Sequence, residues 1–427
     1  MSRVLIWKRV FPGSEYDIFN PTDYDHLWEH VQSEWGGIRQ NWGNKLWFQG
    51  IYSAIDTGEN EYGFIGRTID EEQINNEYDF IVLPMANIFY KDFLSMMQEL
   101  TLHLEKIRIP VFVIVCGVQA DSYDDLDDLI LAIGEDSKRF IRAVYKTGGE
   151  FALRGFFTKE FFDRLGFHSA VVTGCPSIYQ LGPDFTMEYT KVDESRLKPV
   201  FNGHGQSFAE LMNAFPSSVF IDQDEYFEPL FNPEYLSQPS LKFKLNFINS
   251  YGIESAKFLA KGRICTFADM NDWWNFLQNQ KFNYSFGSRI HGTIMAILSG
   301  VPATIIAHDS RTREMAEFFD IPMLTSSPRH LTSRFLLDAY EKMDYSAFNA
   351  NFAQRFATYE HFLTSHGIVS HANVNNHFFT RVADISFGSI YHSNKSDFES
   401  LSSNLSENQA YLLAANNLRK IIRRILK

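Results

Sequence analysis

The fold of this chain is decided by the stretch Gly287-Ser288-Arg289-Ile290-His291-Gly292, which joins two segments of different periodicity. A short apolar run, Tyr284 to Phe286, comes directly before it, and an amphipathic segment from Thr293 to Ser299 follows it. Gly300-Val301-Pro302 then ends the helical pattern, and Thr304 to Ala307 has the character of a second strand. This order predicts a β-α-β unit, the building block of α/β folds.

The start of the predicted helix has the features of an anion site. Ser288 is a good N-cap and Gly300 a good C-terminal stop, so Arg289 and His291 are expected in the first helical turn, beside backbone N–H groups without intrahelical partners. Such amides, the helix dipole and a bidentate guanidinium favour a phosphate or carboxylate. Histidine adds a proton that can move near neutral pH. The spacing alone leaves an alternative, in which Arg289 makes a structural ion pair and His291 caps the turn.

The size and composition are those of a globular protein. The 427 residues are enough for two domains with their own cores, and 45% hydrophobic with 21% charged residues fits that class. The net charge of −13 argues against general nucleic-acid binding, which requires a basic face. Three cysteines occur, none in a C-x-x-C pair, so we expect neither a disulfide framework nor a metal site.

The sequence also predicts where the protein is found. The amino terminus, Met1 to Arg9, has too short an apolar run for a secretory signal, and no segment approaches the roughly 20 apolar residues that a transmembrane helix needs. We therefore expect a cytoplasmic protein. Ser406 to Lys427 is a predicted basic helix, with two interpretations: peripheral contact with an anionic membrane surface, or packing on its own domain.

In the first half of the chain, predicted strands alternate with predicted helices, which indicates a mostly parallel sheet covered on both faces. Polar groups follow the strands where such sheets place their ligands: Gln119 lies in the loop Cys116 to Asp121, and Arg154 ends its strand. The predicted strands are Asp79–Leu83, Val111–Val115, Phe151–Arg154 and Ser169–Thr173, and the predicted helices are Phe93–Lys106 and Thr158–Leu165.

The second half repeats this alternation after a looser segment between Gly182 and Leu197. We predict an N-terminal domain of residues 1–195, a C-terminal domain of residues 196–345 and a helical extension of residues 346–427, with a cleft between the two domains. The predicted elements are a strand from Pro199, a strand-to-helix turn at Asn202–Ser207, a strand at Arg263–Phe267, and helices at Asn271–Gln278 and Arg313–Phe319.

In their order along the chain these motifs resemble the polysaccharide pyruvyltransferase family. The resemblance covers about residues 40 to 325, and the late Gly-Ser-Arg-x-His-Gly block is its most specific part. One departure is Asn44, where the family usually has aspartate. The matching segments are Asn41-Trp42-Gly43-Asn44, Leu153-Arg154, Gly174-Cys175-Pro176-Ser177, Gly287 to Gly292 with Gly300-Val301-Pro302, and Asp309 to Glu314.

The resemblance implies an α/β protein with two Rossmann-like domains in a B-type glycosyltransferase-like arrangement. It also implies an activity, transfer of the enolpyruvyl unit of phosphoenolpyruvate onto a sugar of a surface or exopolysaccharide as a pyruvate ketal. The partners would be phosphoenolpyruvate and a sugar or oligosaccharide acceptor, a lipid-linked acceptor being one alternative. No further cofactor is implied.

The same resemblance implies roles for individual residues. The two acidic groups of phosphoenolpyruvate need two cationic or amide-rich contacts, which we expect from Arg289 with the helix start and from Arg154 of the facing domain. His291 is the candidate general acid for the methylene carbon, or alternatively a neutral donor to the phosphate. Other substrate-binding residues are expected at Ser288, Ile290, Gly292, Arg311, Asn41, Gly43, Asn44, Gln119 and Asp309.

Alternatives remain at two levels. Arg311 could be a solvated surface residue, and Gln119 and Asp309 could make ordinary loop hydrogen bonds. For the whole protein, one alternative is a nucleotide-sugar-dependent glycosyltransferase with the same two-domain fold, in which the anion-binding helix would contact a diphosphate. The other is a non-catalytic carbohydrate-binding scaffold. The presence of Arg154, Arg289 and His291 together argues against the scaffold.

Overall fold

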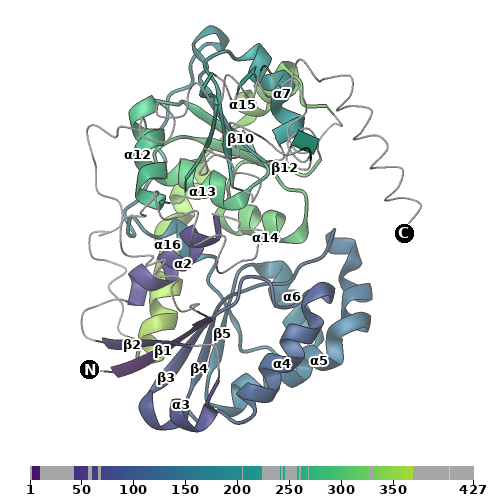
Figure 1. Ribbon diagram of the computed structural model, residues 1–427, viewed down its shortest axis with the longest axis vertical. Helices are drawn as coiled ribbons and strands as arrows, with labels where there is room; N and C mark the ends of the chain where they lie inside the picture. The colour runs from purple at the N-terminus through teal and green to yellow at the C-terminus, as the bar shows by residue number, and fades with distance from the viewer. Residues whose placement is uncertain are drawn as a thin grey trace.

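The computed structural model contains two parallel sheets, one above the other in Figure 1. All the strand pairs in the described part of the chain are parallel. This confirms the predicted α/β class with two Rossmann-like sheets. The structure describes residues 2–9, 43–55, 60–65, 69–203, 205–223, 241, 244–245, 257–258, 261–267, 269–326, 330–368 and 403.

The N-terminal sheet has the strand order β2-β1-β3-β4-β5-β6. Its strands are β1 (Ser2–Arg9), β2 (Asn60–Ile65), β3 (Phe80–Pro84), β4 (Val111–Cys116), β5 (Glu150–Leu153) and β6 (Val171–Val172). The helices of this half are α2 (Gly43–Ile55), α3 (Glu71–Glu77), α4 (Leu94–Leu104), α5 (Leu126–Lys146) and α6 (Phe156–Arg164), with short 3-10 turns η1 (Lys91–Phe93), η2 (Tyr123–Asp125) and η3 (Pro176–Ile178).

The C-terminal sheet has the order β12-β11-β10-β7-β8-β9. Its strands are β7 (Pro199–Asn202), β8 (Val219–Asp222), β9 (Ile264–Thr266), β10 (Tyr284–Gly287), β11 (Ala303–Ile306) and β12 (Met323–Leu324). The remaining helical elements are η4 (Glu194–Arg196), α7 (Gly205–Ala214), α12 (Met270–Gln280), α13 (Ile290–Leu298), α14 (Ser310–Phe319), α15 (Ser333–Lys342) and α16 (Ser346–Ser365).

Strand β3 shows why both faces of the N-terminal sheet are apolar. All its residues are buried, and successive side chains point to opposite faces of a sheet. Ile81 and Leu83 join the cluster formed with α4, α5 and α6. Phe80 and Val82 join a second cluster, which continues into the C-terminal domain. The two domains therefore share one apolar core on that face of the first sheet.

Helix α16 runs from the boundary between the domains towards the first sheet, as the yellow-green helix in Figure 1 shows. Its residues Phe352, Phe356 and Tyr359 surround Tyr179, with ring centroids 5.4 to 5.7 Å away. His366, directly after the helix, lies 4.9 Å from the Phe112 ring of β4. On its other side, Arg355 of this helix donates to Asp320 Oδ2, directly after α14, at 2.6 Å. The extension predicted from residue 346 therefore begins with a helix that contacts both domains.

Several predictions lie outside what the structure tests. The predicted basic helix from Ser406 to Lys427 and the residues before it, 369–402, lie outside the described residues. Among the described helices, none combines the length and apolar character that a bilayer crossing requires.

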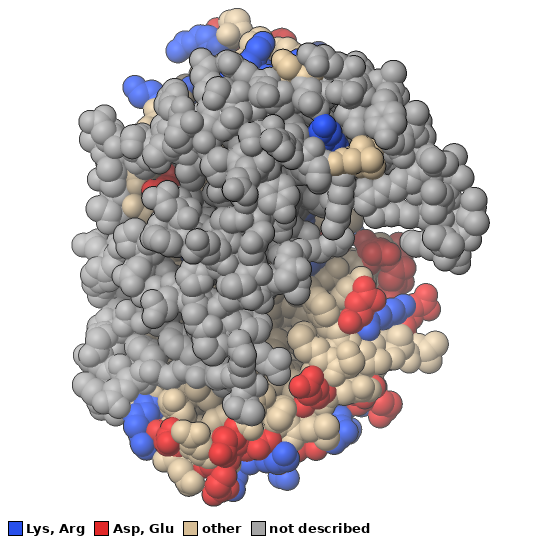
Figure 2. Space-filling view, viewed as in Figure 1, with Lys and Arg blue, Asp and Glu red and all other residues tan. Residues whose placement is uncertain are grey.

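On the face shown in Figure 2, acidic and basic side chains are interspersed over the N-terminal domain. The domain boundaries, the cytoplasmic location and the membrane contact stay predictions.

Two helical glycines provide a matched test of the packing between α2 and η3. A Cβ at Gly50 would lie 2.6 Å from the backbone of Pro176, whereas a Cβ at Gly134 would meet its neighbours at 3.4 to 3.5 Å, an ordinary contact. We expect Gly50→Ala to lower the free energy of unfolding by about 1–3 kcal/mol through overpacking. Gly134→Ala should raise it by about 0.5–1 kcal/mol through helix propensity. Urea denaturation monitored by circular dichroism measures both, and equal effects would contradict the packing.

Candidate anion site at the domain boundary

The turn between β10 and α13 is fixed by the neighbouring strand β7. The Ser288 N–H donates to the backbone oxygen of Asn202 at 3.0 Å, and the Arg289 N–H donates to its Oδ1 at 2.9 Å. Arg289 is the N-cap residue of α13, and its side chain makes no capping hydrogen bond. The prediction that Ser288 caps the helix and that Arg289 lies in its first turn was therefore wrong. Asn202, distant in sequence, instead fixes the turn by accepting from the N–H groups of the two residues that precede the helix.

Glycine is required at both ends of the motif by close approach. A Cβ at Gly287 would lie 1.8 Å from the backbone oxygen of Asn202. A Cβ at Gly292 would lie 2.3 Å from the side-chain nitrogen of Gln223, the residue that follows β8. The ends of β7 and β8 therefore surround the start of α13, and a larger residue at either glycine would displace it.

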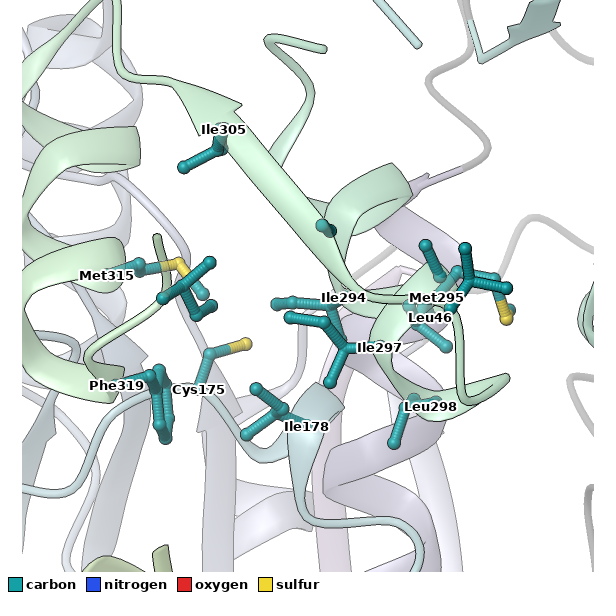
Figure 3. Close-up of a cluster of buried hydrophobic side chains, with 14 of the residues drawn as sticks. Leu46, Cys175, Ile178, Ile294, Met295, Ile297, Leu298, Ile305, Met315 and Phe319 are labelled. Carbon is teal, nitrogen blue, oxygen red and sulfur yellow. The ribbon is translucent and has the colours of Figure 1, made fainter. Parts of the chain in front are cut away.

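The rest of α13 is buried between the two domains, which places its amino end at their boundary. Every residue from Gly292 to Leu298 is buried. Figure 3 shows the residues that meet here, which come from α2, η3, α13, β11 and α14. They include Leu46, Cys175, Ile178, Ile294, Ile297, Leu298, Ile305, Met315 and Phe319. Three motifs of the family resemblance thus come together in space, since α2 contains the Gly43-Asn44 pair and η3 follows Gly174.

His291 is partly buried, and its Nε2 lies 4.0 Å from the Sγ of Cys175. Burial, followed by the positive charges of Arg154 and Arg311, lowers the pKa of His291 from 6.5 to about 3. The imidazole is therefore neutral at pH 7 in the unliganded protein. In the unliganded protein, His291 is therefore suited to donate a hydrogen bond as a neutral ring rather than to act as a general acid. A bound anion would raise its pKa.

Arg289 stands among charged groups of the C-terminal domain. It is partly buried, and burial lowers the pKa of its guanidinium. The carboxylates of Asp222 and Asp309 act on it in the opposite direction, and the charge of Arg311 acts with burial. Asp222, which is buried at the end of β8, is a site residue that the sequence analysis missed. The sequence pattern that could have indicated Asp222 is a short apolar run, Val-Phe-Ile, followed directly by this carboxylate.

Arg154 reaches the domain boundary as predicted, but it has a carboxylate partner there. Its Nε donates to Glu314 Oε1 at 3.1 Å, and both side chains are buried. Its Nη2 donates to the backbone oxygen of Val118 at 3.4 Å. No described residue accepts a hydrogen bond from Nη1. The charge of Arg154 is therefore paired with a carboxylate, and the predicted contact of Arg154 with the substrate, through Nη1, stays a prediction.

Asp309 and Arg311 form a local pair at the start of α14. Asp309 is the N-cap of this helix and makes a capping box with Thr312. Arg311 donates to Asp309 Oδ2 from Nε at 2.8 Å and from Nη2 at 2.5 Å. The loop hydrogen bonds considered for Asp309 are thus present. Arg311 remains close enough to influence the pKa of both Arg289 and His291, so it belongs to the site.

The other predicted binding residues have mixed outcomes. Gln119 accepts a hydrogen bond from Asn87 at 2.5 Å at the carboxyl edge of the first sheet. Asn44 is exposed in the first turn of α2, next to Gly43, and accepts from Trp47 Nε1 at 3.4 Å. These contacts do not join them to Arg289 or His291. Asn41 lies outside the described residues, Ser288 and Ile290 are partly buried at the site, and Gly292 is buried.

Strand β4 contains a strained residue just before the loop beside Arg154. Val115 has φ +67°, and the register between β4 and β5 shifts between Ile114 and Cys116. A β-branched residue rarely adopts positive φ, and such strain is concentrated at functional sites. The chain then reaches Gly117, where a Cβ would lie 2.2 Å from Arg154 Nη2. The bulge therefore brings the backbone directly against the guanidinium of Arg154, which the apolar strand pattern did not indicate.

Comparison with known proteins supports the family resemblance. The family model described as polysaccharide pyruvyl transferase matches residues 104–310, and the resemblance is confirmed over these residues. The matched segment contains Arg154, Arg289 and His291 but not the early Asn41 motif. A solved glycosyltransferase, SnogD from Streptomyces nogalater, is 10% identical with a TM-score of 0.32, covering 86% of this chain and 99% of that chain. That score carries no weight for function. No curated protein matches the sequence significantly.

The protonation state of His291 can be measured directly. We expect its imidazole NMR signals to show no titration between about pH 5 and 8, because its pKa of about 3 lies far below 6.5. The unfolded chain takes up this proton more readily, so the stability contributed by the neutral ring is lost as the pH falls from 6.5 towards 3. Comparison with spectra of His291→Gln assigns the signals. A midpoint near 6.5 would contradict the buried, cation-flanked site.

Proposed function

We propose that this protein transfers the pyruvyl group of phosphoenolpyruvate to two hydroxyls of a polysaccharide sugar, forming a cyclic ketal. The family match supports pyruvyl transfer to a polysaccharide, and thus a transferase. The donor and the ketal product are the finer part of the proposal. The observation that carries it is the amino end of α13 at the domain boundary, where Arg289 and His291 lie with Arg154 and Arg311 close enough to act on the histidine.

The charges at this site suit a small molecule with two acidic groups. The phosphate would contact Arg289 and the first amides of α13, since a helix amino end and a guanidinium both favour an anion. Arg311 and the Nη1 group of Arg154 would contact the remaining negative charge. Asp222, Asp309 and Glu314 offset these cations in the unliganded protein. To bind, an anion has to compete with these carboxylates for the arginines. A ligand with two acidic groups competes better than a singly charged carboxylate, so the site favours phosphoenolpyruvate.

The proposed chemistry begins with a proton transfer to the methylene carbon of phosphoenolpyruvate. This creates an oxocarbenium-like centre at the adjacent carbon, where one sugar hydroxyl adds and loses its proton. A second hydroxyl of the same sugar then forms a bond to that carbon and gives up its proton to the departing phosphate as the carbon–oxygen bond to phosphate breaks. The products are the ketal and inorganic phosphate, so no redox partner is needed.

His291 would provide the proton once the donor is bound. In the unliganded protein the ring is neutral, partly because of the charges of Arg154 and Arg311. The negative charge of the phosphate and carboxylate would offset these two cations and raise the pKa of His291. The ring would then take up a proton and donate it within the complex. If its pKa stays low with ligand present, His291 instead acts as the neutral donor to the phosphate.

The acceptor part of the proposal follows the family match alone. The acceptor would be a sugar or oligosaccharide, either soluble or linked to a lipid, and the reaction would take place in the cytoplasm. Contact with the inner face of the membrane through the basic C-terminal segment would bring a lipid-linked acceptor close. Gln119 and Asn44, at polar positions apart from the anion site, are the proposed contacts to the acceptor or to the outer part of the donor.

A comparison of ligands tests this function. Purified protein mixed with phosphoenolpyruvate should show a raised melting temperature, and with host surface glycans it should release phosphate and increase the acceptor mass by one pyruvyl group. Stabilisation by nucleotide sugars alone would contradict the proposal in favour of a glycosyltransferase. An absence of any ligand effect would favour the non-catalytic scaffold.

Replacement of Arg289 gives the sharpest mutational test. We expect Arg289→Ala to reduce phosphate release by about 100-fold or more, because it removes a cation that stabilises the transferred phosphate. Its melting temperature should stay close to that of the unchanged protein. Arg334→Ala is the matched control, since Arg334 is exposed on α15 and, among the described residues, pairs with Asp338 one turn further along the same helix. If Arg289→Ala fails to fold while Arg334→Ala folds, Arg289 has a structural role.

A further inference from the structure

We infer that Glu314 is a positioning residue for the donor site, because it fixes the guanidinium of Arg154 across the domain boundary. Glu314 lies on α14 of the C-terminal domain, and Arg154 follows β5 of the N-terminal domain. The inference rests on the proposed function, in which Arg154 contacts the donor. It assigns to a buried carboxylate a role in substrate affinity.

The carboxylate of Glu314 uses both of its oxygens to join the domains. Oε1 accepts from Arg154 Nε at 3.1 Å, and Oε2 accepts from the Thr158 N–H at 3.0 Å. The Thr158 hydroxyl lies 3.0 and 2.9 Å from the two oxygens. Thr158 lies in the first turn of α6, whose N-cap is Gly155 and has no side chain to cap it. Glu314 therefore satisfies an amide at the start of α6 and also interacts favourably with its dipole.

The surroundings restrict the position of Arg154 while Glu314 is present. Its side chain is 6% exposed and that of Glu314 is 1% exposed, so neither group can exchange its partner for water. A Cβ at Gly155 would lie 2.8 Å from Glu314 Oε2, and a Cβ at Gly117 would lie 2.2 Å from Arg154 Nη2. The backbone at Gly117 and Gly155 therefore packs closely against the ion pair from two sides. Breaking a buried pair leaves an uncompensated charge, so the arrangement is strongly specified.

This geometry orients the guanidinium rather than blocking it. The ion pair uses Nε, and Nη2 donates to Val118, while Nη1 has no acceptor among the described residues. A guanidinium has five N–H donors, so donors remain for a ligand. Arg154 is also near enough to His291 for its charge to lower the pKa of the imidazole. Its remaining donors are therefore held close to the residue proposed to transfer the proton.

A carboxylate is needed at residue 314 because an amide accepts on one oxygen only. In Glu314→Gln, the amide nitrogen would face a donor, either Thr158 N–H or Arg154 Nε–H. The Thr158 N–H is fixed in α6, so the arginine side chain is the group that moves. We expect the KM for phosphoenolpyruvate to rise by about tenfold, the equivalent of one charge-assisted hydrogen bond, with a smaller change in kcat.

Glu317→Gln is the matched control. Glu317 is on the same helix and also joins the domains, since Tyr123 donates to its Oε2 at 2.7 Å, but its Oε1 accepts from Arg313 rather than from Arg154. It should lose stability without a change in KM beyond about twofold. Glu314→Asp keeps the charge and both acceptor oxygens, but its side chain is one methylene shorter, so it should also raise the KM. This variant replaces Glu314→Gln in the test if Glu314→Gln does not fold.

Steady-state kinetics with phosphoenolpyruvate, together with calorimetric binding of phosphoenolpyruvate in the absence of an acceptor, test the inference. Weaker binding and a raised KM in the folded Glu314 variants, but not in Glu317→Gln, would support it. Unchanged values in Glu314→Gln or, if that variant does not fold, in Glu314→Asp would overturn it and leave the pair as an interdomain contact. If the unchanged protein binds phosphoenolpyruvate but transfers its pyruvyl group to no acceptor, the proposed function fails, and the binding affinities still decide the role of Glu314.

Discussion

The burial of α13 between the two domains is the constraint on which the site depends. This helix packs on α2 and η3 of the N-terminal half, while the two residues before it donate to Asn202 of the C-terminal sheet. Its amino end is therefore oriented by both halves of the chain. Arg289 and His291 have a defined position only because these apolar and polar contacts are satisfied together.

Compensated charge is the second property of the site. Arg154 pairs with Glu314, Arg311 pairs with Asp309, and Asp222 acts on Arg289. Without this compensation, three arginines near one neutral histidine would repel one another in a partly buried region. Compensation also makes the site selective, because an anion binds well only if it interacts more favourably with the cations than the local carboxylates do.

The sequence predicted the repeating elements well and the tertiary contacts poorly. The apolar runs of β3 and β4 lie within one residue of their predicted limits, since buried parallel strands have a distinctive composition. The predicted N-cap of α13 was wrong because Asn202, far away in sequence, fixes the turn through the N–H groups of Ser288 and Arg289. Glu314 and Asp222 were missed as partners for a similar reason, since no local pattern shows which carboxylate a distant arginine will meet. Arg289 and His291 could be proposed from the sequence because their motif is local.

The most direct measurement of the central claim is a crystal structure of the protein with phosphoenolpyruvate. The account predicts that the phosphate lies within hydrogen-bond distance of the Arg289 guanidinium and of the first amides of α13, with His291 facing the methylene carbon. Ligand density elsewhere, with the start of α13 occupied only by protein side chains, would contradict it.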